Sequence, residues 1–522
     1  MRLKDSFWIF FIILLCIHAI LVLQIDFFPF ADVPSHLAEG VIYKYYNQAS
    51  NLFNQYYTLN YKFYPNTFHL FFFALPIFPD VEVANKVLHL FLVVTLPILV
   101  LLIIKELNGN RWFAIISFIL VYNYNLTFGF TGNAIANNVV LLILLLWLRA
   151  VSNQSRYVRN MVFISLLLLV VYFSHAMVAL FCMMMVGSFL LYRYRTNFKG
   201  LVLNSFVLVP LGLLVVYWWF VLQKSAENSA GFTTEETSTG AFMKEYYKHE
   251  YLQTFLIRAK FMVADNAQLF NGPLGKIVAL LLAFIILVPF IIIAYKYFFN
   301  RNNAQQQGLF PAIDEKMVYV FILLLVSCFC YFLLPQRIPG QEPLYERFST
   351  ILLFALIFIA CKAPQVDNRI FAYAAILVAF AHLVLWGQYF YQFDQENKGF
   401  AEVLPKDNTK KLSYMNYDPY YRGRMIYDHF QNYFIVRDKG ISTTRIIDYR
   451  FGMIRRKASG GLPYQAYMYY NESPREMIAK SDYLLVRGDI AARDQKILDS
   501  LNTFRKVKDV NKWHLLQRVS KQ

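Results

Sequence analysis

Charged side chains are scarce in this chain. Asp, Glu, Lys and Arg make up only 16% of its 522 residues, whereas a soluble domain carries about a quarter. The deficit falls in long apolar runs, many of which reach the roughly 20 residues needed to cross the hydrocarbon core of a bilayer. The sequence therefore excludes an ordinary soluble domain and predicts a polytopic membrane protein.

Cysteine is rare, and the common catalytic motifs are missing. The five cysteines all lie in apolar runs and none lies in the last quarter of the chain, so they predict neither a disulfide framework nor a metal site. No phosphate loop, dinucleotide-binding fingerprint, nucleophile elbow or zinc pattern occurs. The tripeptide Arg487-Gly488-Asp489 follows a predicted strand and is interpreted as a turn.

Basic residues outnumber acidic ones, and the formal net charge is +17. The surplus lies in short loops between apolar runs and in the tail, where 24 Lys and Arg stand against 15 Asp and Glu from position 391 on. This placement indicates membrane topology and contact with anionic lipid. We therefore expect no nucleic-acid partner.

Eleven apolar runs are predicted to be spanning helices. They lie at about 6–25, 84–104, 111–129, 134–150, 160–174, 176–192, 200–222, 274–296, 317–335, 347–363 and 369–390. The first run has no convincing cleavage site after it and is interpreted as a retained span rather than a signal peptide.

One further apolar segment, Phe68 to Phe78, is too short to span, and prolines bracket it. When it is left out of the count, most loop cations fall on the same side of the membrane as the N-terminus. The positive-inside rule then places the N-terminus in the cytoplasm and the segment at the outer surface. The expected location is a cell membrane, most simply a bacterial inner membrane.

This topology divides the chain into two predicted parts. Residues 1–390 form the membrane domain, with outer loops at 26–83 and 223–272, and the stretch from Ser35 to Asn54 reads as an amphipathic helix. Residues 391–522 form a small extracytoplasmic α/β domain. Within it, Tyr483–Val486 and Trp513–Leu516 are predicted strands and Arg493–Leu501 a predicted helix.

Asp, Glu, Lys and Arg are almost absent from the interiors of the predicted spans, where only scattered histidines occur. Ion-coupled transporters place such groups at mid-membrane, so that class is disfavoured. Polar residues gather instead where the spans reach the outer surface. That distribution favours an enzyme that works at the outer face of the membrane.

The first of these outer mouths contains Asp32, His36 and Glu39. Asp32 precedes a helical stretch that begins with proline, so it is either an N-cap or a general base at the lipid–water boundary. His36 and Glu39 are either solvated helix-face residues or substrate contacts.

Three other mouths supply further candidates. His175 is either a polar turn residue or a donor to phosphate, and Arg337 and Arg347 are candidates for phosphate binding because guanidinium groups bind phosphate in a two-pronged way. Arg347 is alternatively a snorkelling side chain or a partner for its neighbour Glu346. Asn133 and Asn137 are candidate substrate contacts at a mouth without acids, which argues against a metal site there.

This layout resembles the GT-C class of integral-membrane glycosyltransferases, which includes protein mannosyltransferases, lipid A aminoarabinose transferases and bacterial oligosaccharyltransferases. The shared features are an aspartate soon after the first span, a long first outer loop with a short apolar piece beginning near Pro65, many further spans, and a C-terminal extracytoplasmic α/β domain. A cytoplasmic turn at 107–111 also matches, and the Asp-x-Pro-x-His spelling at 32–36 is similar to a bacterial subset of the class.

The resemblance implies that Asp32 is the catalytic base and that Arg347 occupies the type of position at which members bind the donor phosphate. The expected reaction is transfer of a sugar from a polyprenyl-phosphate carrier to a glycan, lipid or protein acceptor in the cell envelope, with inversion at the anomeric carbon. We expect no cofactor and no metal site, with a divalent metal as an open alternative. A lipid-linked glycan polymerase, ligase or flippase, and a non-enzymatic transporter or scaffold, are the competing interpretations.

Overall fold

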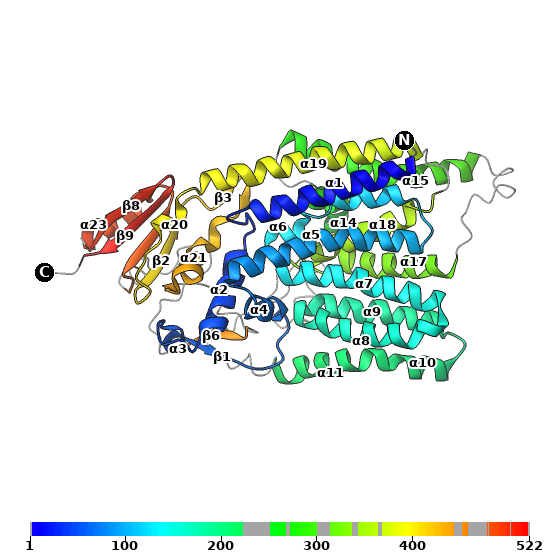
Figure 1. Cartoon of the computed structure of the whole chain (residues 1–522), viewed down its shortest axis with the longest axis horizontal. Helices are drawn as coiled ribbons and strands as arrows, with labels where there is room; N and C mark the ends of the chain where they lie inside the picture. The colour runs from blue at the N-terminus through cyan, green and yellow to red at the C-terminus, as the bar shows by residue number, and fades with distance from the viewer. Residues whose placement is uncertain are drawn as a thin grey trace.

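The computed structural model is an elongated bundle of helices with a β-sheet at one end (Figure 1). It describes residues 3–222, 251–267, 272–299, 314–336, 343–363, 368–442, 452–457, 478, 480–501 and 503–519. The two ends of the bundle differ in chemistry. The end away from the sheet carries ion pairs between the ends of helices, such as Lys316–Glu106 at 2.8 Å and Arg193–Glu315 at 3.4 Å.

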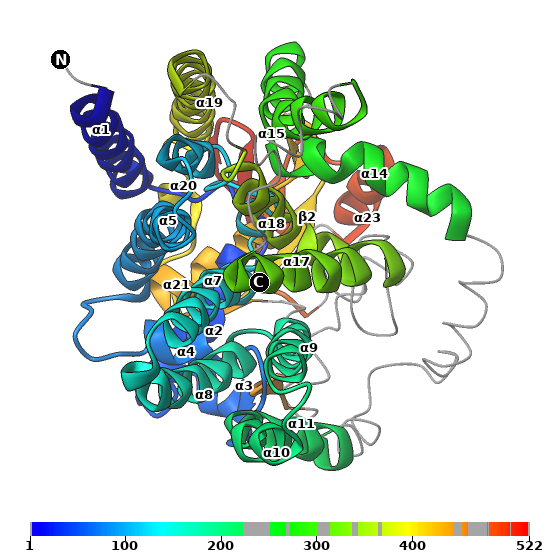
Figure 2. The same ribbon diagram turned by 90° about the vertical axis from the view of Figure 1, so that its right-hand side faces the viewer.

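Within the described residues, nine helical stretches are long and apolar enough to cross a membrane, as a polytopic membrane protein requires. They are built on α1 (Leu3–Gln24), α5 (Val81–Glu106), α7 (Thr131–Ser152), α8 (Tyr157–Ser174), α9 (Ala176–Arg193), α10 (Phe198–Ser205) with α11 (Val209–Tyr217), α15 (Pro273–Phe299), α17 (Glu315–Cys328) and α19 (Asn368–Glu396). Figure 2 shows several of these helices, among them α8, α15 and α19, close to end-on.

Two of the eleven predicted spans are not among these nine helical stretches. The run 111–129 forms a 3₁₀ helix, η1 (Arg111–Phe118), and a separate short helix, α6 (Tyr124–Phe128); the run 347–363 forms η6 (Tyr345–Phe348) and the 12-residue α18 (Ser349–Ala360). Nearly all their side chains are buried by neighbouring helices. Irregular backbone is tolerated at membrane depth when protein rather than lipid surrounds it, and hydropathy alone does not register that difference.

The segment predicted to be the first outer loop folds back onto the bundle. Its short apolar piece is a six-residue helix, α4 (Phe68–Phe73), which confirms that this segment does not span. The predicted amphipathic helix is α2 (Val33–Tyr45), which ends earlier than expected and is buried along most of its length between α4 and the C-terminal domain. After it come α3 (Phe53–Tyr56) and β1 (Tyr57–Leu59). The segment predicted to be the second outer loop contains a helix that the sequence did not predict, α14 (Tyr251–Ala267).

The C-terminal part is an α/β domain, as predicted. Five strands pair in the order β5-β2-β7-β9-β8, parallel around β2 and antiparallel from β7 onward. Their bounds are β2 (Lys411–Asn416), β5 (Ile441–Ser442), β7 (Tyr483–Arg487), β8 (Phe504–Val510) and β9 (Trp513–Arg518). The two predicted strands are β7 and β9, and the predicted helix is α23 (Ala492–Leu501), so all three predictions are confirmed.

Several short elements join the two parts. The last span, α19, continues to Glu396, beyond the predicted boundary at 390, and α20 (Phe400–Val403) follows it. The hairpin β3 (Tyr420–Tyr421) and β4 (Arg424–Met425), the 3₁₀ helix η7 (Tyr427–Asn432) and α21 (Tyr433–Asp438) come next. A strand from the far end of the sequence, β6 (Ile454–Arg456), pairs antiparallel with β1 of the first outer loop.

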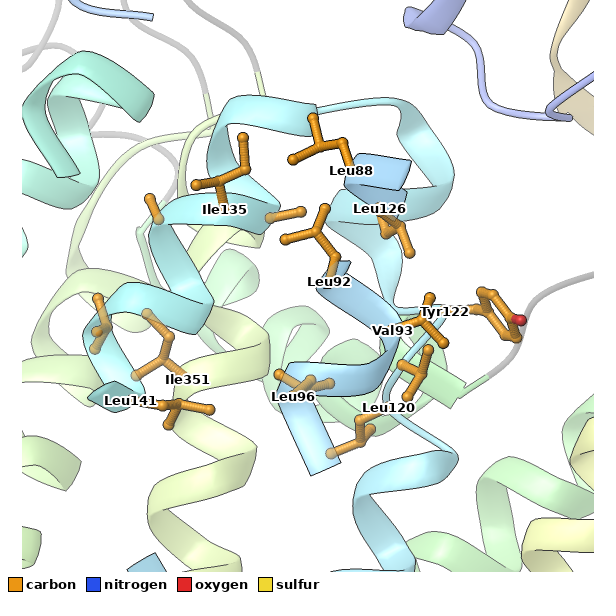
Figure 3. Close-up of a cluster of buried hydrophobic side chains, with 14 of the residues drawn as sticks. Leu88, Leu92, Val93, Leu96, Leu120, Tyr122, Leu126, Ile135, Leu141 and Ile351 are labelled. Carbon is orange, nitrogen blue, oxygen red and sulfur yellow. The ribbon is translucent and has the colours of Figure 1, made fainter. Parts of the chain in front are cut away.

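An apolar core holds the helices of the bundle together next to the junction with the C-terminal domain. Leu88, Leu92 and Leu96 of α5 face Ile135 and Leu141 of α7, with Ile351 of α18 behind them (Figure 3). All are buried. Lipid tails are as apolar as leucine, so close packing rather than water exclusion favours this arrangement, and it fixes the outer ends of α5, α6 and α7 relative to one another.

Candidate active site

Asp32 lies where the first outer loop, the helix bundle and the C-terminal domain meet. It occupies the N-cap position of α2, but its side chain makes no capping hydrogen bond. Its carboxylate instead points toward η7 of the C-terminal domain, with Oδ1 3.6 Å from Nε2 of His429. The capping alternative therefore does not account for the orientation of this side chain.

Close contact with α6 fixes the backbone at Asp32. The Asp32 amide donates to the carbonyl of Phe128 at 3.2 Å. The next residue, Gly129, has φ +92°, and a Cβ there would lie 2.5 Å from the Asp32 nitrogen. Glycine is thus required at position 129 for two reasons, the left-handed backbone and the close approach to the Asp32 backbone.

Replacement of Gly129 by alanine is expected to displace Asp32. The rate of any reaction that depends on the placement of Asp32 should then fall. A shift of about 1 Å in a reacting group costs on the order of 100-fold in rate, and the left-handed backbone adds about 1–2 kcal/mol of strain. The measurement is turnover by the purified variant. Gly212→Ala is the matched control, because nothing lies within 4 Å of a Cβ at Gly212. A wild-type rate for Gly129→Ala would show that this contact does not position Asp32.

Burial raises the pKa of Asp32 to about 6. The nearby groups His36 and Arg347 oppose this shift, whereas Asp428 and Glu39 add to it. A carboxylate with a raised pKa accepts a proton more readily than an ordinary aspartate and remains largely ionised near neutral pH. The side chain is 20% exposed, so a substrate can reach it.

The opening beside Asp32 is a cavity of about 1130 Å³. One wall is apolar and comes from α15 and α18, including Leu280, Leu287 and Leu353. The other end is polar and holds Asp32, Asp428 and His429. A cavity with an apolar wall along membrane helices and a polar end beside the C-terminal domain suits an amphiphilic ligand.

Three basic side chains line the same cavity: Lys260 of α14, Lys276 of α15 and Arg424 of β4. None was a candidate in the sequence analysis, and neither were Asp428 and His429. No short pattern marks these five residues. Only the folding of α14 and of the segment from β4 to η7 against the bundle brings them to Asp32.

Arg347 and His175 were predicted at separate mouths, and the structure brings them together. Arg347 Nη1 lies 2.7 Å from His175 Nε2, and Arg347 Nε donates to the carbonyl of Pro343 at 2.7 Å. The guanidinium also stacks over the ring of Phe130, 3.9 Å from its centroid. Burial, and secondly the charge of Arg347, lower the pKa of His175 well below its usual value, so its ring is neutral and accepts from the arginine.

The remaining predicted residues lie deeper or elsewhere. Asn137 donates to Asn133 within α7 at 3.2 Å, and both are buried. His36 and Glu39 lie against His69 of α4 rather than in the cavity. Arg337 lies outside the described residues. Asp32 is thus the one predicted residue among the described side chains that line the cavity.

Comparison with protein families and with curated proteins identifies no relative of this chain. No protein-family model matches the chain, and no curated protein matches it. The chemistry must therefore be argued from the site. It combines a basic carboxylate, three cations and an apolar wall at one end of a helix bundle.

Proposed function

We propose that this protein is a membrane glycosyltransferase of the GT-C type that moves a sugar from a polyprenyl-phosphate carrier to an acceptor at the outer face of the membrane. The observation that carries the proposal is the shared cavity. A carboxylate of raised pKa, three cationic side chains and an apolar wall on spanning helices line one space. A polyprenyl-phosphate sugar presents the matching parts, which are a hydroxyl-bearing ring, an anionic phosphate and a lipid tail.

Each part of the cavity has one role in the proposed reaction. The acceptor hydroxyl oxygen attacks the anomeric carbon as its proton passes to Asp32, and the bond from that carbon to the phosphate oxygen breaks. The carrier leaves as a polyprenyl phosphate, and its growing negative charge lies among Lys260, Lys276 and Arg424. Fixed cations aimed at developing charge are among the largest contributions to catalysis. A single base and a direct displacement favour inversion at the anomeric carbon.

Arg347 has a supporting role in this scheme. Two of its donors already bind Pro343 and His175, so the guanidinium is held in place behind Asp32. Its charge favours the ionised form of Asp32. We therefore assign phosphate binding chiefly to the three cavity cations.

Removal of a cavity cation is expected to weaken donor binding. Lys276→Gln, and separately Lys260→Gln, should raise the KM for the donor about 5- to 10-fold, since both side chains are exposed and water screens their charges. The double variant should show a larger increase. Steady-state kinetics with the donor as varied substrate measure the effect.

Lys406→Gln is the control for the change of charge, because Lys406 pairs with Asp438 on the surface of the C-terminal domain. It should leave the donor KM unchanged. An unchanged KM in the double cavity variant would remove these lysines from donor recognition.

The direct test of the function is incubation of the purified protein with a panel of polyprenyl-phosphate sugars, with detection of released carrier by mass spectrometry. Consumption of a diphosphate-linked oligosaccharide instead would favour a polymerase or ligase. Binding of every donor without release of any carrier would favour a transporter or scaffold.

A further inference from the structure

A second polar cluster lies one helical turn from Asp32, on the side away from the cavity cations. His36 and Glu39 come from α2 and His69 comes from α4, and one potential ligand atom from each lies within 4.8 Å of the other two. Asp32, His36 and Glu39 follow each other at spacings of four and three residues, so they share one face of α2.

Two of the three distances in the cluster are close to those of a coordination sphere, and all three potential ligand atoms lie within 4.8 Å of one another. His36 Nδ1 lies 3.1 Å from His69 Nε2 and 3.5 Å from Glu39 Oε2. Zinc binds imidazole nitrogen and carboxylate oxygen at 2.0–2.2 Å, and a tetrahedron of that size has edges of about 3.3 Å. The two measured edges lie on either side of this value.

Hydrogen bonding alone satisfies the cluster poorly. A neutral imidazole has a single N–H, and His36 Nδ1 faces both His69 Nε2 and Glu39 Oε2. If His69 donates to His36, the lone pair of His36 Nδ1 also faces the carboxylate, so two acceptors oppose each other. If His36 Nδ1 carries the proton instead, its one hydrogen is shared between His69 Nε2 and the carboxylate. A cation between the three atoms would satisfy all of their lone pairs at once.

The carboxylate itself is a second and independent indication. Glu39 is only 7% exposed, and within the described part of the chain its one ion pair is with His36. Buried carboxylates are normally paired with a permanent cation or bound to a metal. His69 is buried beside it, with only 2% of its surface exposed.

The supporting structure is rigid. The Thr67 amide before α4 donates to the carbonyl of Phe173 at 2.7 Å, and Lys44 Nζ at the end of α2 donates to the carbonyl of Phe78 at 2.9 Å. The first contact joins the start of α4 to the end of α8, and the second joins α2 to the turn after α4. The two helices also pack closely, since a Cβ at Gly40 of α2 would lie 3.0 Å from Phe73 Cβ of α4. The ligand set is therefore preorganised rather than assembled by the ion.

We propose that His36, Glu39 and His69 bind one divalent transition-metal ion, of which Zn²⁺ is the best match, and that this ion fastens α4 to the helix that begins at Asp32. Two imidazoles and one carboxylate favour Zn²⁺ over Mg²⁺ or Ca²⁺, which prefer oxygen ligands. Three protein ligands leave a fourth coordination position for water or substrate.

The test is the metal content of the full-length protein, purified in detergent with a tag that contains no histidine. After equilibration with micromolar Zn²⁺ and removal of excess ion, elemental mass spectrometry should find about one Zn²⁺ per chain. Glu39→Gln and His69→Asn should each reduce this to about one tenth or less. Added Zn²⁺ should raise the melting temperature of the wild type, and Mg²⁺ should not.

His514→Asn is the control, because His514 pairs with the exposed Asp509 on β8, an edge strand of the sheet, and has no part in the cluster. It should retain the full zinc content. Glu39→Gln preserves side-chain shape, so it distinguishes loss of a ligand from misfolding if His69→Asn does not fold. A wild type that binds no zinc, or a folded Glu39→Gln that retains it, would overturn the proposal. Zinc content is measured without any sugar donor, so its outcome does not depend on the glycosyltransferase assignment.

Discussion

Replacement of Asp32 by asparagine is expected to lower sugar transfer by roughly 10²- to 10⁴-fold, the usual contribution of a general base. The amide has nearly the same shape as the carboxylate but does not accept the proton of the attacking hydroxyl. Folding should be little affected, because the Asp32 side chain makes no capping hydrogen bond that the change would remove. Carrier release from a polyprenyl-phosphate sugar, with protein reconstituted in liposomes, measures the loss.

Asp438→Asn provides the matched control. Asp438 is a partly buried aspartate of the C-terminal domain whose partner is the exposed Lys406, so the same chemical change there should leave turnover unaltered. Turnover of Asp32→Asn at the wild-type rate would exclude Asp32 as the base. Loss of donor binding rather than of turnover would assign Asp32 to recognition instead.

The sequence predicted those site residues whose depth follows from the thickness of the membrane. A span has a nearly fixed length, so polar residues that follow the outward-running spans all end at the same depth. His175 and Arg347 were found in this way at separate mouths, and the structure places them 2.7 Å apart. The sequence did not predict that they bind each other, because the lateral order of helices depends on packing rather than on hydropathy.

The missed residues come from contacts between distant parts of the chain. His429 and Asp428 reach Asp32 only because η7 lies against α2, where Asn432 Nδ2 donates to Ser35 Oγ at 2.8 Å. Lys260 is positioned by α14, a helix that mean hydropathy does not reveal because it is too polar to resemble a span. Such positions have no local sequence signal.

The same reasoning explains why one predicted span, 111–129, is not a continuous helix. The run 111–129 is apolar enough to span, yet it is broken between Phe118 and Tyr124, where Asn123 begins a new helix by accepting from the amides of Asn125 and Leu126. This break lets Phe128 and Gly129 turn toward Asp32. A local rule of helix formation thus fails at the candidate site, where placement of a functional group outweighs regularity.

The C-terminal domain is held to the last span by a buried arginine, Arg487, whose side chain is fully buried at the end of β7. Its guanidinium binds Glu396 at the end of α19, and its Nε donates to the carbonyl of Asp418 at 3.0 Å. It also stacks on the ring of Tyr427, 3.2 Å from the centroid. Because Arg487 is buried, the tripeptide Arg487-Gly488-Asp489 is not an exposed recognition motif. This agrees with its interpretation as a turn after the strand.

Arg487→Met is expected to destabilise the C-terminal domain by about 3 kcal/mol, the lower end of the cost of breaking a buried ion pair, because both acids retain some contact with water. The melting temperature of the domain should fall by on the order of 10 °C. Tyr427 begins η7, so transfer should also decrease as His429 loses its fixed position beside Asp32. Fluorescence of the neighbouring Trp513 during heating reports the unfolding.

Lys512→Gln tests whether burial decides the size of this effect. Lys512 pairs with the same two acids, at 2.7 Å from Asp418 and 3.9 Å from Glu396, but its side chain is 53% exposed. Exposed ion pairs contribute about 0–1 kcal/mol, so this variant should melt within a few degrees of the wild type. Equal melting temperatures for both variants would mean that the apolar contacts between α19, η7 and the sheet hold the domain, with the arginine contributing little to its attachment.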